Sequence, residues 1–480
     1  MSDISTLPMH QVERIHFVGI GGAGMSGIAE VFKNLGYRIS GSDLHKNRMT
    51  AHLEQIGVQV VYQHIASNVS DADVVVFSSA VDDENPELIA AREARIPVVP
   101  RAEMLVELMR FRRGIAVAGT HGKTTTTSLI AAVLAEGGLD PTFVIGGLVH
   151  SVNSHARLGS GSYLVCEADE SDASFLLLSP LMAVLTNIDA DHMDTYEGDF
   201  NKLRESFVTF FRRLPFYGVA IVCSDDSNIV EVLPEIRART VTYGINSEAD
   251  VRAVNIRADG VRCHFDVSIT GHGSPYPVTL NMPGRHNVQN CLAAIAVALE
   301  LGLSEEAVTR ALENFQGVGR RCQYRGENAL NGKRVSLIDD YGHHPREISA
   351  TCEAVRDGWP GKRLIVAFQP HRYSRTRDLF EDFVEALSLP DALVMLEIYA
   401  AGEDPIPGAD ARALCRAVRT RGKVEPIFAA TDTDMIDILS DIAEDDDVLL
   451  ILGAGNIGRA VELFEFVERP LNIASKGAPV

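Results

Sequence analysis

The sequence predicts an α/β protein with largely parallel sheets, arranged as three domains. Strand-like runs alternate with helical patterns along most of the 480 residues, and three of these runs end in glycine-rich loops. Most of the runs are nearly continuous in Val, Ile and Leu, as expected of parallel strands that are buried on both faces. Ten runs stand out, at residues 14–20, 72–80, 115–120, 162–168, 182–188, 218–226, 334–340, 363–369, 392–398 and 447–455.

The three glycine loops suggest one α/β unit each, because ligands bind at the carboxyl ends of parallel strands. A helix-like segment at 101–114 connects the first two units. Residues 240–283 alternate polar and apolar, which predicts a small antiparallel excursion within the second unit. Residues 314–325 are rich in Gly and Arg and break the helical periodicity. We therefore expect domains at residues 1–108, 109–321 and 322–480.

Charge and composition exclude several classes of protein. The formal net charge is −21, whereas a non-specific nucleic-acid surface needs a basic footprint. No basic segment with an apolar core opens the sequence, and no apolar run has membrane-spanning length, so we expect a cytosolic protein without a membrane partner. The seven cysteines are widely spaced, which predicts reduced, buried thiols. We expect a monomer or a homodimer.

The first glycine loop follows the run at 14–20. Gly19, Gly21 and Gly24 spell G-x-G-x-x-G, and Asp43 follows at the end of the next expected strand. This is the dinucleotide fingerprint, in which amides at a helix start bind a diphosphate. The motif does not distinguish NAD from a UDP-linked ligand, and purely structural glycines are the alternative.

The second loop lies in GIAVAGTHGKTTTT. Its spacing departs from the usual G-x-x-x-x-G-K-[ST], because Val117 stands where the first glycine belongs. The residues of the motif that act on a nucleotide are nevertheless present: Gly119, Gly122, Lys123 and Thr124. The ammonium can bridge two phosphates and the hydroxyl can hold Mg²⁺, so the loop predicts a nucleoside triphosphate site. A glycine turn with a surface lysine is the alternative.

The third loop again spells G-x-G-x-x-G, with Gly453, Gly455 and Gly458. A tight strand-to-helix turn requires such glycines without any ligand. Both a binding role and a structural role therefore stay open.

Acidic residues end two of the other strand-like runs. Glu167 ends one of them, at the position where a P-loop enzyme keeps an acid for Mg²⁺. His192 lies in the segment DADHMD after the next run. A hard cation prefers oxygen ligands but tolerates one imidazole. We therefore expect both residues to hold a metal ion, with surface hydrogen bonding as the alternative for His192.

Polar residues suited to ligand binding recur later. Asn287 and Asn290 share one helix face and could read a base edge or cap the helix. Two loops that follow expected strands combine aromatic, imidazole and guanidinium groups. The first loop contains Asp340, Tyr341, His343 and His344, and the second contains His371, Arg372, Tyr373 and Arg375. Arginine suits carboxylate or phosphate binding and imidazole can act as a base. Solvated loops are the alternative.

Several segments together resemble the bacterial Mur ligases: GIGGAGMSGIAE, AGTHGKTTTT, EADESDASFL, DHMDTYEGDF, LPFYG, DDYGHHP and QPHRYSRTRDLF. The resemblance implies an ATP-dependent amide ligase of peptidoglycan precursor synthesis. It implies a Rossmann-like N-terminal domain for the UDP-linked substrate, a central P-loop ATPase-like domain and a C-terminal Rossmann-like domain on the amino-acid side. The implied reaction joins L-alanine to the lactyl carboxylate of UDP-N-acetylmuramate through an acyl phosphate, with ATP and two Mg²⁺ ions.

The resemblance also implies a role for each matching residue. The UDP-linked substrate would contact Gly21, Gly22, Ala23, Gly24, Met25, Ser26, Asp43, Ser78 and Ser79. ATP would contact Gly119, Thr120, His121, Gly122, Lys123, Thr124, Thr125, Asn287, Asn290, Arg321 and Asp340. The metal ligands would be Thr124, Glu167 and His192. The muramoyl carboxylate and alanine would meet Tyr341, His343, His371, Arg372 and Tyr373. The implied catalytic residues are Lys123, Glu167, His192, His343, His371 and Arg372.

Some alternatives stay open. Arg320 is a rival of Arg321 for the nucleotide phosphate, and Cys322 replaces an aromatic residue expected there. Phe207 stands where related ligases carry a carbamylated lysine, so we expect no such group. A related peptide-recycling ligase shares the ATP loop. An NAD-dependent oxidoreductase or a P-loop motor would leave most of the other motifs unexplained.

Overall fold

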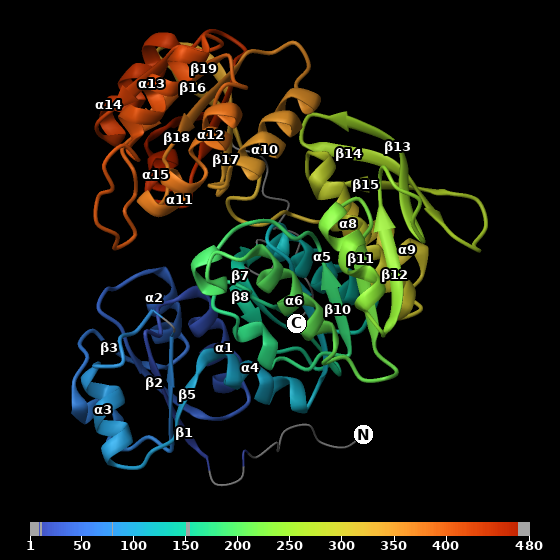
Figure 1. Cartoon of the computed structure of the whole chain (residues 1–480), viewed down its shortest axis with the longest axis vertical. Helices are drawn as coiled ribbons and strands as arrows, with labels where there is room; N and C mark the ends of the chain where they lie inside the picture. The colour runs from blue at the N-terminus through green and yellow to red at the C-terminus, as the bar shows by residue number, and fades with distance from the viewer. Residues whose placement is uncertain (1–8, 10–11, 79, 150–153, 469–480) are drawn as a thin grey trace. The chain divides into compact units, whose positions relative to one another are not determined.

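The computed structural model describes residues 9, 12–78, 80–149 and 154–468 (Figure 1). Contact density divides these residues into two compact units. The first runs to Val254 and adds Val267–Tyr276 and Gln289–Phe315, and the second comprises Asn255–Asp266, Pro277–Val288 and the chain from Gln316 onward. Three sheets form, with helices between their strands, so the predicted α/β class with three sheet-containing regions is confirmed. The domain boundaries at 108 and 321 stay predictions.

The first sheet has five parallel strands in the order β3-β2-β1-β4-β5. They are β1 (Arg14–Val18), β2 (Arg38–Ser42), β3 (Gln59–Val61), β4 (Val74–Phe77) and β5 (Val98–Pro100). The helical segments are α1 (Ala23–Asn34), α2 (Arg48–Gln55), η1 (Ala66–Val69), α3 (Pro86–Glu93) and α4 (Arg101–Arg110). The helix predicted between the first two units is thus confirmed as α4.

The second sheet has ten strands in the order β15-β14-β13-β12-β11-β10-β6-β9-β7-β8. They are β6 (Arg113–Ala118), β7 (Thr142–Val149), β8 (Ser154–Arg157), β9 (Tyr163–Glu167), β10 (Met182–Leu185), β11 (Val219–Cys223), β12 (Arg239–Gly244), β13 (Val251–Asp259), β14 (Arg262–Ile269) and β15 (Tyr276–Leu280). The helical segments are α5 (Lys123–Glu136), η2 (Ser174–Leu177), η3 (Met193–Tyr196), α6 (Phe200–Phe211), α7 (Ser227–Val232), η4 (Leu233–Glu235), α8 (Arg285–Glu300) and α9 (Glu305–Glu313).

The antiparallel excursion begins later than the alternating pattern suggested. The alternating segment VTYGI begins within strand β12, and β12 pairs parallel with both β11 and β13. The connection between β13 and β14 spans only Gly260 and Val261, and so short a connection can join only antiparallel strands. Side chains on one face of β12 are partly exposed, so polar and apolar residues alternate along it. The strand nevertheless belongs to the parallel part of the sheet.

The third sheet has seven strands in the order β20-β19-β18-β21-β17-β16-β22, and β16 pairs antiparallel with both of its neighbours. They are β16 (Gln323–Leu330), β17 (Lys333–Asp340), β18 (Leu364–Phe368), β19 (Ala392–Leu396), β20 (Pro426–Ala429), β21 (Val448–Leu452) and β22 (Glu465–Glu468). The helical segments are α10 (Pro345–Gly358), α11 (Tyr373–Asp378), α12 (Phe380–Ala386), α13 (Ala411–Arg421), α14 (Asp432–Ile442), α15 (Ile457–Ala460) and η5 (Val461–Leu463).

Burial on both faces explains the continuous apolar runs. In β18, Leu364, Val366 and Phe368 belong to one hydrophobic core, and Ile365 and Ala367 belong to another. Because side chains alternate along a strand, the two cores lie on opposite faces of the third sheet. All seven cysteines are free and buried, as predicted. Among the described residues, we find no helix with the length and apolar character needed to cross a membrane.

Candidate active site

Three neighbouring parallel strands of the second sheet bring three of the predicted catalytic residues, Lys123, Glu167 and His192, to one edge. Strand β6 lies between β10 and β9 and is parallel to both. The second glycine loop follows β6, Glu167 ends β9, and His192 lies in the loop after β10. The carboxyl ends of parallel strands share one edge of a sheet, where ligands bind in open α/β folds.

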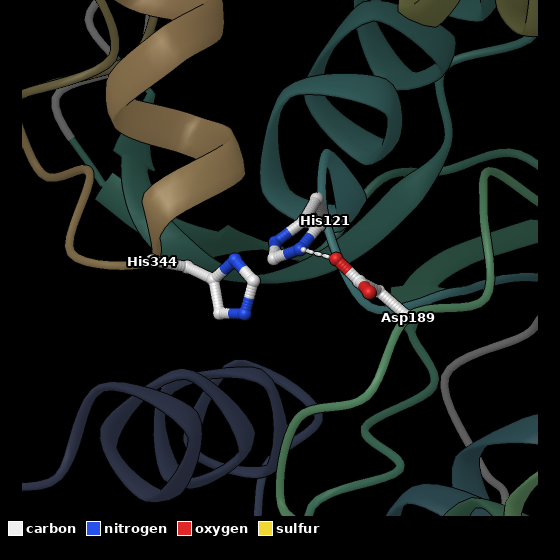
Figure 2. A group of neighbouring side chains, drawn as sticks. All are labelled: His121, Asp189 and His344. Atoms are coloured by element: carbon white, nitrogen blue, oxygen red, sulfur yellow. Dashed lines mark hydrogen bonds and ion pairs between the residues drawn. The ribbon is translucent and has the colours of Figure 1, made fainter. Parts of the chain in front are cut away.

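The loop after β10 holds the second glycine loop by hydrogen bonds. The backbone N–H of His121 donates to Asn187 Oδ1 at 2.8 Å, and the carbonyl of His121 accepts from Thr186 Oγ1 at 2.6 Å. The His121 ring lies 3.2 Å from the Asp189 carboxylate, measured from Nε2 to Oδ2 (Figure 2). Gly119 has φ +123°, and a Cβ on it would lie 2.2 Å from Thr186 Oγ1. This glycine is therefore required by both conformation and space.

Lys123 is tied to its own loop and to a buried carboxylate. Its ammonium donates to the carbonyls of Gly119 at 2.7 Å and Thr120 at 3.1 Å, and to Glu170 Oε2 at 2.7 Å. Burial by itself would lower the pKa of Lys123, but the carboxylates of Glu170 and Asp169 raise it overall. Burial raises the pKa of Glu170 to about 7 despite the neighbouring ammonium.

Glu167 and Thr124 lie next to each other, as a metal site requires. Glu167 Oε1 accepts from the backbone N–H of Gly146 at 2.7 Å, and the nearby Thr124 hydroxyl acts to lower the pKa of the same carboxylate. Burial raises the pKa of Glu167, so a cation beside it would stabilise its charged form. Two adjacent oxygen donors, the buried Thr124 hydroxyl and the partly buried Glu167 carboxylate, fit a hard divalent cation. His192 has φ +53° and immediately precedes η3.

The threonine run that follows Lys123 is buried, and the hydroxyls of Thr126 and Thr127 hydrogen-bond within the protein. Thr127 Oγ1 donates to the Lys123 carbonyl at 2.8 Å, and Thr126 Oγ1 donates to Asn290 Oδ1 at 3.2 Å. Asn290 therefore holds the first turn of α5, directly after the second glycine loop. Asn287 lies in the first turn of α8, and its Nδ2 donates to the carbonyl of Pro283, which precedes the helix, at 2.7 Å. The proposed reading of a base by this pair stays a prediction.

The end of β2 fixes the first glycine loop. The Ser42 carbonyl accepts from the N–H groups of Gly19 at 2.9 Å and Ile20 at 3.0 Å, and Asp43 Oδ2 accepts from the N–H of Gly21 at 2.8 Å. Asp43 thus orders the loop itself. Helix α1 starts just after Gly22, so the backbone from Ala23 to Gly24 forms its first turn. Its amide groups favour an anion there.

The remaining predicted residues of the first region differ in accessibility. The side chains of Met25 and Ser26 are buried. The Ser78 N–H donates to the Val18 carbonyl at 3.3 Å, which places Ser78 beside the first loop. Ser79, also predicted to bind substrate, lies outside the described residues.

In the second unit, Asp340 ends β17, and its side chain is buried and hydrogen-bonded to backbone N–H groups. Its carboxylate accepts from the N–H groups of Cys322 at 2.6 Å and Gly342 at 2.7 Å. Burial raises the pKa of Asp340 to about 6, while the charge of Arg321 opposes the increase. The small Cys322 side chain is 4% exposed and belongs to the core of this unit.

The structure separates the two rival arginines. Arg320 Nε lies 3.2 Å from Asp339 Oδ1, and its guanidinium also donates to the Gly453 carbonyl. Arg321 comes no closer than 4.0 Å to Glu347. Both guanidiniums lie 5.2 Å from the centre of the Tyr341 ring. Arg320 is therefore committed to the fold, and Arg321 is the better candidate for a phosphate.

The two predicted polar loops of this unit meet. The rings of His343 and His371 have centroids 5.7 Å apart, and His371 stacks on Tyr399 at 5.5 Å and 13°. Burial, followed by the nearby cationic side chains, lowers the pKa of His371 to about 4. Arg372 has φ +70° and lies 3.9 Å from Glu403, immediately before Tyr373 begins α11. His371 is therefore a neutral imidazole near pH 7.

The third glycine loop is explained by packing. A Cβ on Gly455 would lie 2.4 Å from Gln369 Oε1, and one on Gly458 would lie 2.3 Å from the Arg320 guanidinium carbon. Gly453 has φ +147°, and its Cβ would lie 2.8 Å from the Gln369 carbonyl. Packing and backbone conformation therefore account for these three glycines without a ligand.

Three residues at the site were missed by the sequence reasoning: Glu170, Thr186 and Asn187. Glu170 is 1% exposed, in the segment EADESD, where only the strand-ending Glu167 was singled out. Thr186 and Asn187 directly follow β10 in MAVLTNI. Their position at a strand end beside the P-loop strand was the available signal, but strand order is not readable from one sequence.

Comparison with known proteins gives a consistent result. Three family models match successive parts of the chain: "Mur ligase family, catalytic domain" at residues 14–113, "Mur ligase middle domain" at 117–298, and "Mur ligase, glutamate ligase domain" at 320–455.

Solved structures resemble the same chain over long stretches. The UDP-N-acetylmuramate-alanine ligase MurC from Thermotoga maritima has a TM-score of 0.79 and 30% identity, covering 94% of this chain and 97% of that one. The ligase MPL from Neisseria meningitides has a TM-score of 0.59 and 30% identity, covering 64% and 100%. A murein peptide ligase from Psychrobacter arcticus has a TM-score of 0.68 at 24% identity, covering 94% and 97%, and supports the fold alone.

Proposed function

Because the chain belongs to the Mur ligase family, we propose that it is an ATP-dependent ligase joining L-alanine to the lactyl carboxylate of UDP-N-acetylmuramate. One observation carries the choice of substrate. Identity of 30% with the alanine ligase of Thermotoga maritima extends over 94% of this chain and 97% of that one. The reaction would be a step in peptidoglycan precursor synthesis.

We assign the substrates to three domains, at residues 1–108, 109–321 and 322–480. The first glycine loop would bind the UDP diphosphate through the amides that open α1. ATP would lie on the second glycine loop, whose helix α5 starts at Lys123. The muramoyl carboxylate and the alanine would meet the Tyr341 and His371 loops.

The first step is a phosphoryl transfer. The lactyl carboxylate attacks the γ-phosphate of ATP, the bond to ADP breaks, and an acyl phosphate forms. Charge on the transferred group is offset by Lys123 and by the loop amides, which are the usual tools of this chemistry. Mg²⁺ held by Thr124, Glu167 and His192 would neutralise further phosphate charge.

The second step makes the amide. The amine of alanine loses a proton, attacks the acyl carbon and displaces inorganic phosphate. His343 or His371, whose ring centroids lie 5.7 Å apart, would accept that proton, and His371 is a weak base because burial lowers its pKa to about 4. Arg372 is suited to the alanine carboxylate, because a guanidinium binds carboxylates bidentately.

The test combines ATP, Mg²⁺ and UDP-N-acetylmuramate with each amino acid in turn. Phosphate release and product mass are measured together. We expect both to depend on L-alanine, with serine and glycine as the closest competitors to examine. Phosphate release without an amide product, or release that ignores the UDP-sugar, would contradict the proposal.

A peptide-adding ligase is the second candidate, because the Neisseria meningitides enzyme is also 30% identical. That enzyme is described as joining UDP-N-acetylmuramate to L-alanyl-γ-D-glutamyl-meso-diaminopimelate. The same assay with this tripeptide distinguishes the two. Faster turnover with the tripeptide than with L-alanine would favour the second candidate.

A further inference from the structure

Glu170 is a buried carboxylate that the proposed reaction does not use. It is 1% exposed, and both of its oxygens accept from Lys123, at 2.7 and 3.0 Å. Its own segment is anchored, because the Tyr196 hydroxyl donates to the Glu170 carbonyl at 2.6 Å and the N–H of Ala173 donates to the same carbonyl at 3.1 Å. Glu170 is therefore held in place while it holds the lysine.

Lys123 has no donor to spare in this arrangement. An ammonium has three N–H donors, and here they serve the carbonyls of Gly119 and Thr120 and the carboxylate of Glu170. To contact a triphosphate, Lys123 must give up at least one of these partners. The carboxylate is the partner that a phosphate replaces, since both are anions that pair with the ammonium charge.

We propose that Glu170 is a positioning residue that holds Lys123 away from the triphosphate in the free protein and releases it when the nucleotide binds. The inference rests on the proposed ATP site. Release leaves Glu170 buried without its cation, which is costly for a carboxylate. Burial already raises the pKa of Glu170 to about 7, so the side chain can take up a proton when the lysine leaves. The Glu170–Lys123 contact thus competes with the nucleotide and weakens its binding.

The test measures the affinity of the full chain for a non-hydrolysable ATP analogue with Mg²⁺ by titration calorimetry. Glu170→Gln keeps the shape of the side chain and removes its charge, and we expect it to bind the analogue about tenfold more tightly, as for loss of one competing charge-assisted hydrogen bond. Asp172→Asn is the matched control, because Asp172 lies two residues away, is exposed, and has its own bond to the N–H of Ser174 at 3.0 Å. It should bind like the wild type.

A double-mutant cycle distinguishes release of the lysine from simple repulsion between Glu170 and the phosphates. In a Lys123→Met background, Glu170→Gln should no longer tighten binding, because the competing contact is already gone. An undiminished gain in that background would overturn the inference in favour of repulsion. Glu170→Asp, which keeps the charge but shortens the reach, should also bind more tightly than the wild type and provides a second variant if Glu170→Gln fails to fold.

Failure of the Glu170 inference and failure of the proposed ATP site would give different results. Equal or weaker binding by Glu170→Gln, with a wild-type chain that binds the analogue, would overturn this inference alone. A wild-type chain that binds no nucleotide would overturn the proposed function and this inference with it.

Discussion

Thr186 offers the most direct test of how the second glycine loop is held. Its hydroxyl donates to the His121 carbonyl at 2.6 Å and packs against Gly119. Thr186→Val keeps the shape and removes the donor. The His121 carbonyl would retain one partner, the Asn187 side-chain amide at 3.0 Å, so no carbonyl becomes wholly unpaired. The loss is therefore near that of one ordinary hydrogen bond, about 1 kcal/mol.

Part of that loss should appear in nucleotide binding, because the proposed ATP site includes the amides of this loop. A full 1 kcal/mol corresponds to binding weakened by about fivefold. Thr186→Ser is the matched control, since it keeps the hydroxyl and loses only a buried methyl. We expect both variants to melt at lower temperature by circular dichroism, but only Thr186→Val to lose affinity in calorimetry. Wild-type affinity in Thr186→Val, or an equal loss in Thr186→Ser, would refute the reasoning.

Three further changes test other parts of the structure. His371→Ala should abolish amide formation while ADP production from the first step survives, as measured by product mass and coupled ADP assay. Gly455→Ala should lower the melting temperature, because its Cβ would lie 2.4 Å from Gln369 Oε1, and should leave ATP affinity unchanged. Burial would raise the pKa of Glu87, but the nearby His16 ring, 3.7 Å away, and hydrogen bonds from Ser42 and Asn68 hold it at about 2. Glu87→Gln should therefore destabilise the protein at neutral pH, and the difference should disappear as pH falls from about 4.5 toward 2.

Each of these expectations has a contrary result. Loss of ADP production in His371→Ala would move that residue to the first step. Weakened ATP binding in Gly455→Ala would argue for a ligand role of the third loop. Gly273→Ala is the control for adding a methyl group, since nothing lies within 4 Å of its Cβ. For Glu87, a stability difference that persists unchanged at pH 2 would mean that packing, rather than charge, is lost.

Strands with continuous apolar sequences were predictable because their burial is two-sided. Strand β18 reads LIVAF, and its residues divide between two cores. Strand β2 reads RISGS and carries no such pattern. A Cβ on its Gly41 would lie 2.5 Å from Ile20 Cδ1, so the position requires glycine because space is short, which hydropathy does not reveal. Strand β16 reads QYRGENAL, and its pairing with β17 and β22 depends on contacts distant in sequence. Such strands carry little local signal.

Site residues divide along a similar line. Glu167 was predictable because it ends an apolar strand, where a charged side chain is conspicuous. Glu170 follows in a run of acids, and nothing local marks it as the partner of Lys123. Asp43 was predicted as a substrate residue from its distance to the first loop, and the structure shows its carboxylate bonded to the Gly21 amide at 2.8 Å. Spacing identifies which segments meet, whereas the division of hydrogen bonds between fold and ligand requires coordinates.

The short spacing of the second glycine loop follows from its neighbour in the sheet. Val117, at the position of the missing glycine, is a fully buried residue of β6 that pairs with Val184 on one side and Glu167 on the other. The strand therefore continues where a longer P-loop would already have turned. The turn comes at Gly119. Within the loop, the Lys123 ammonium donates to the Gly119 and Thr120 carbonyls, and the segment after β10 adds hydrogen bonds to His121 through Thr186 and Asn187. The second glycine loop and this neighbouring segment are thus held together as one structure, so we expect a substitution in TNID to disturb the proposed ATP site as a substitution in the loop itself would.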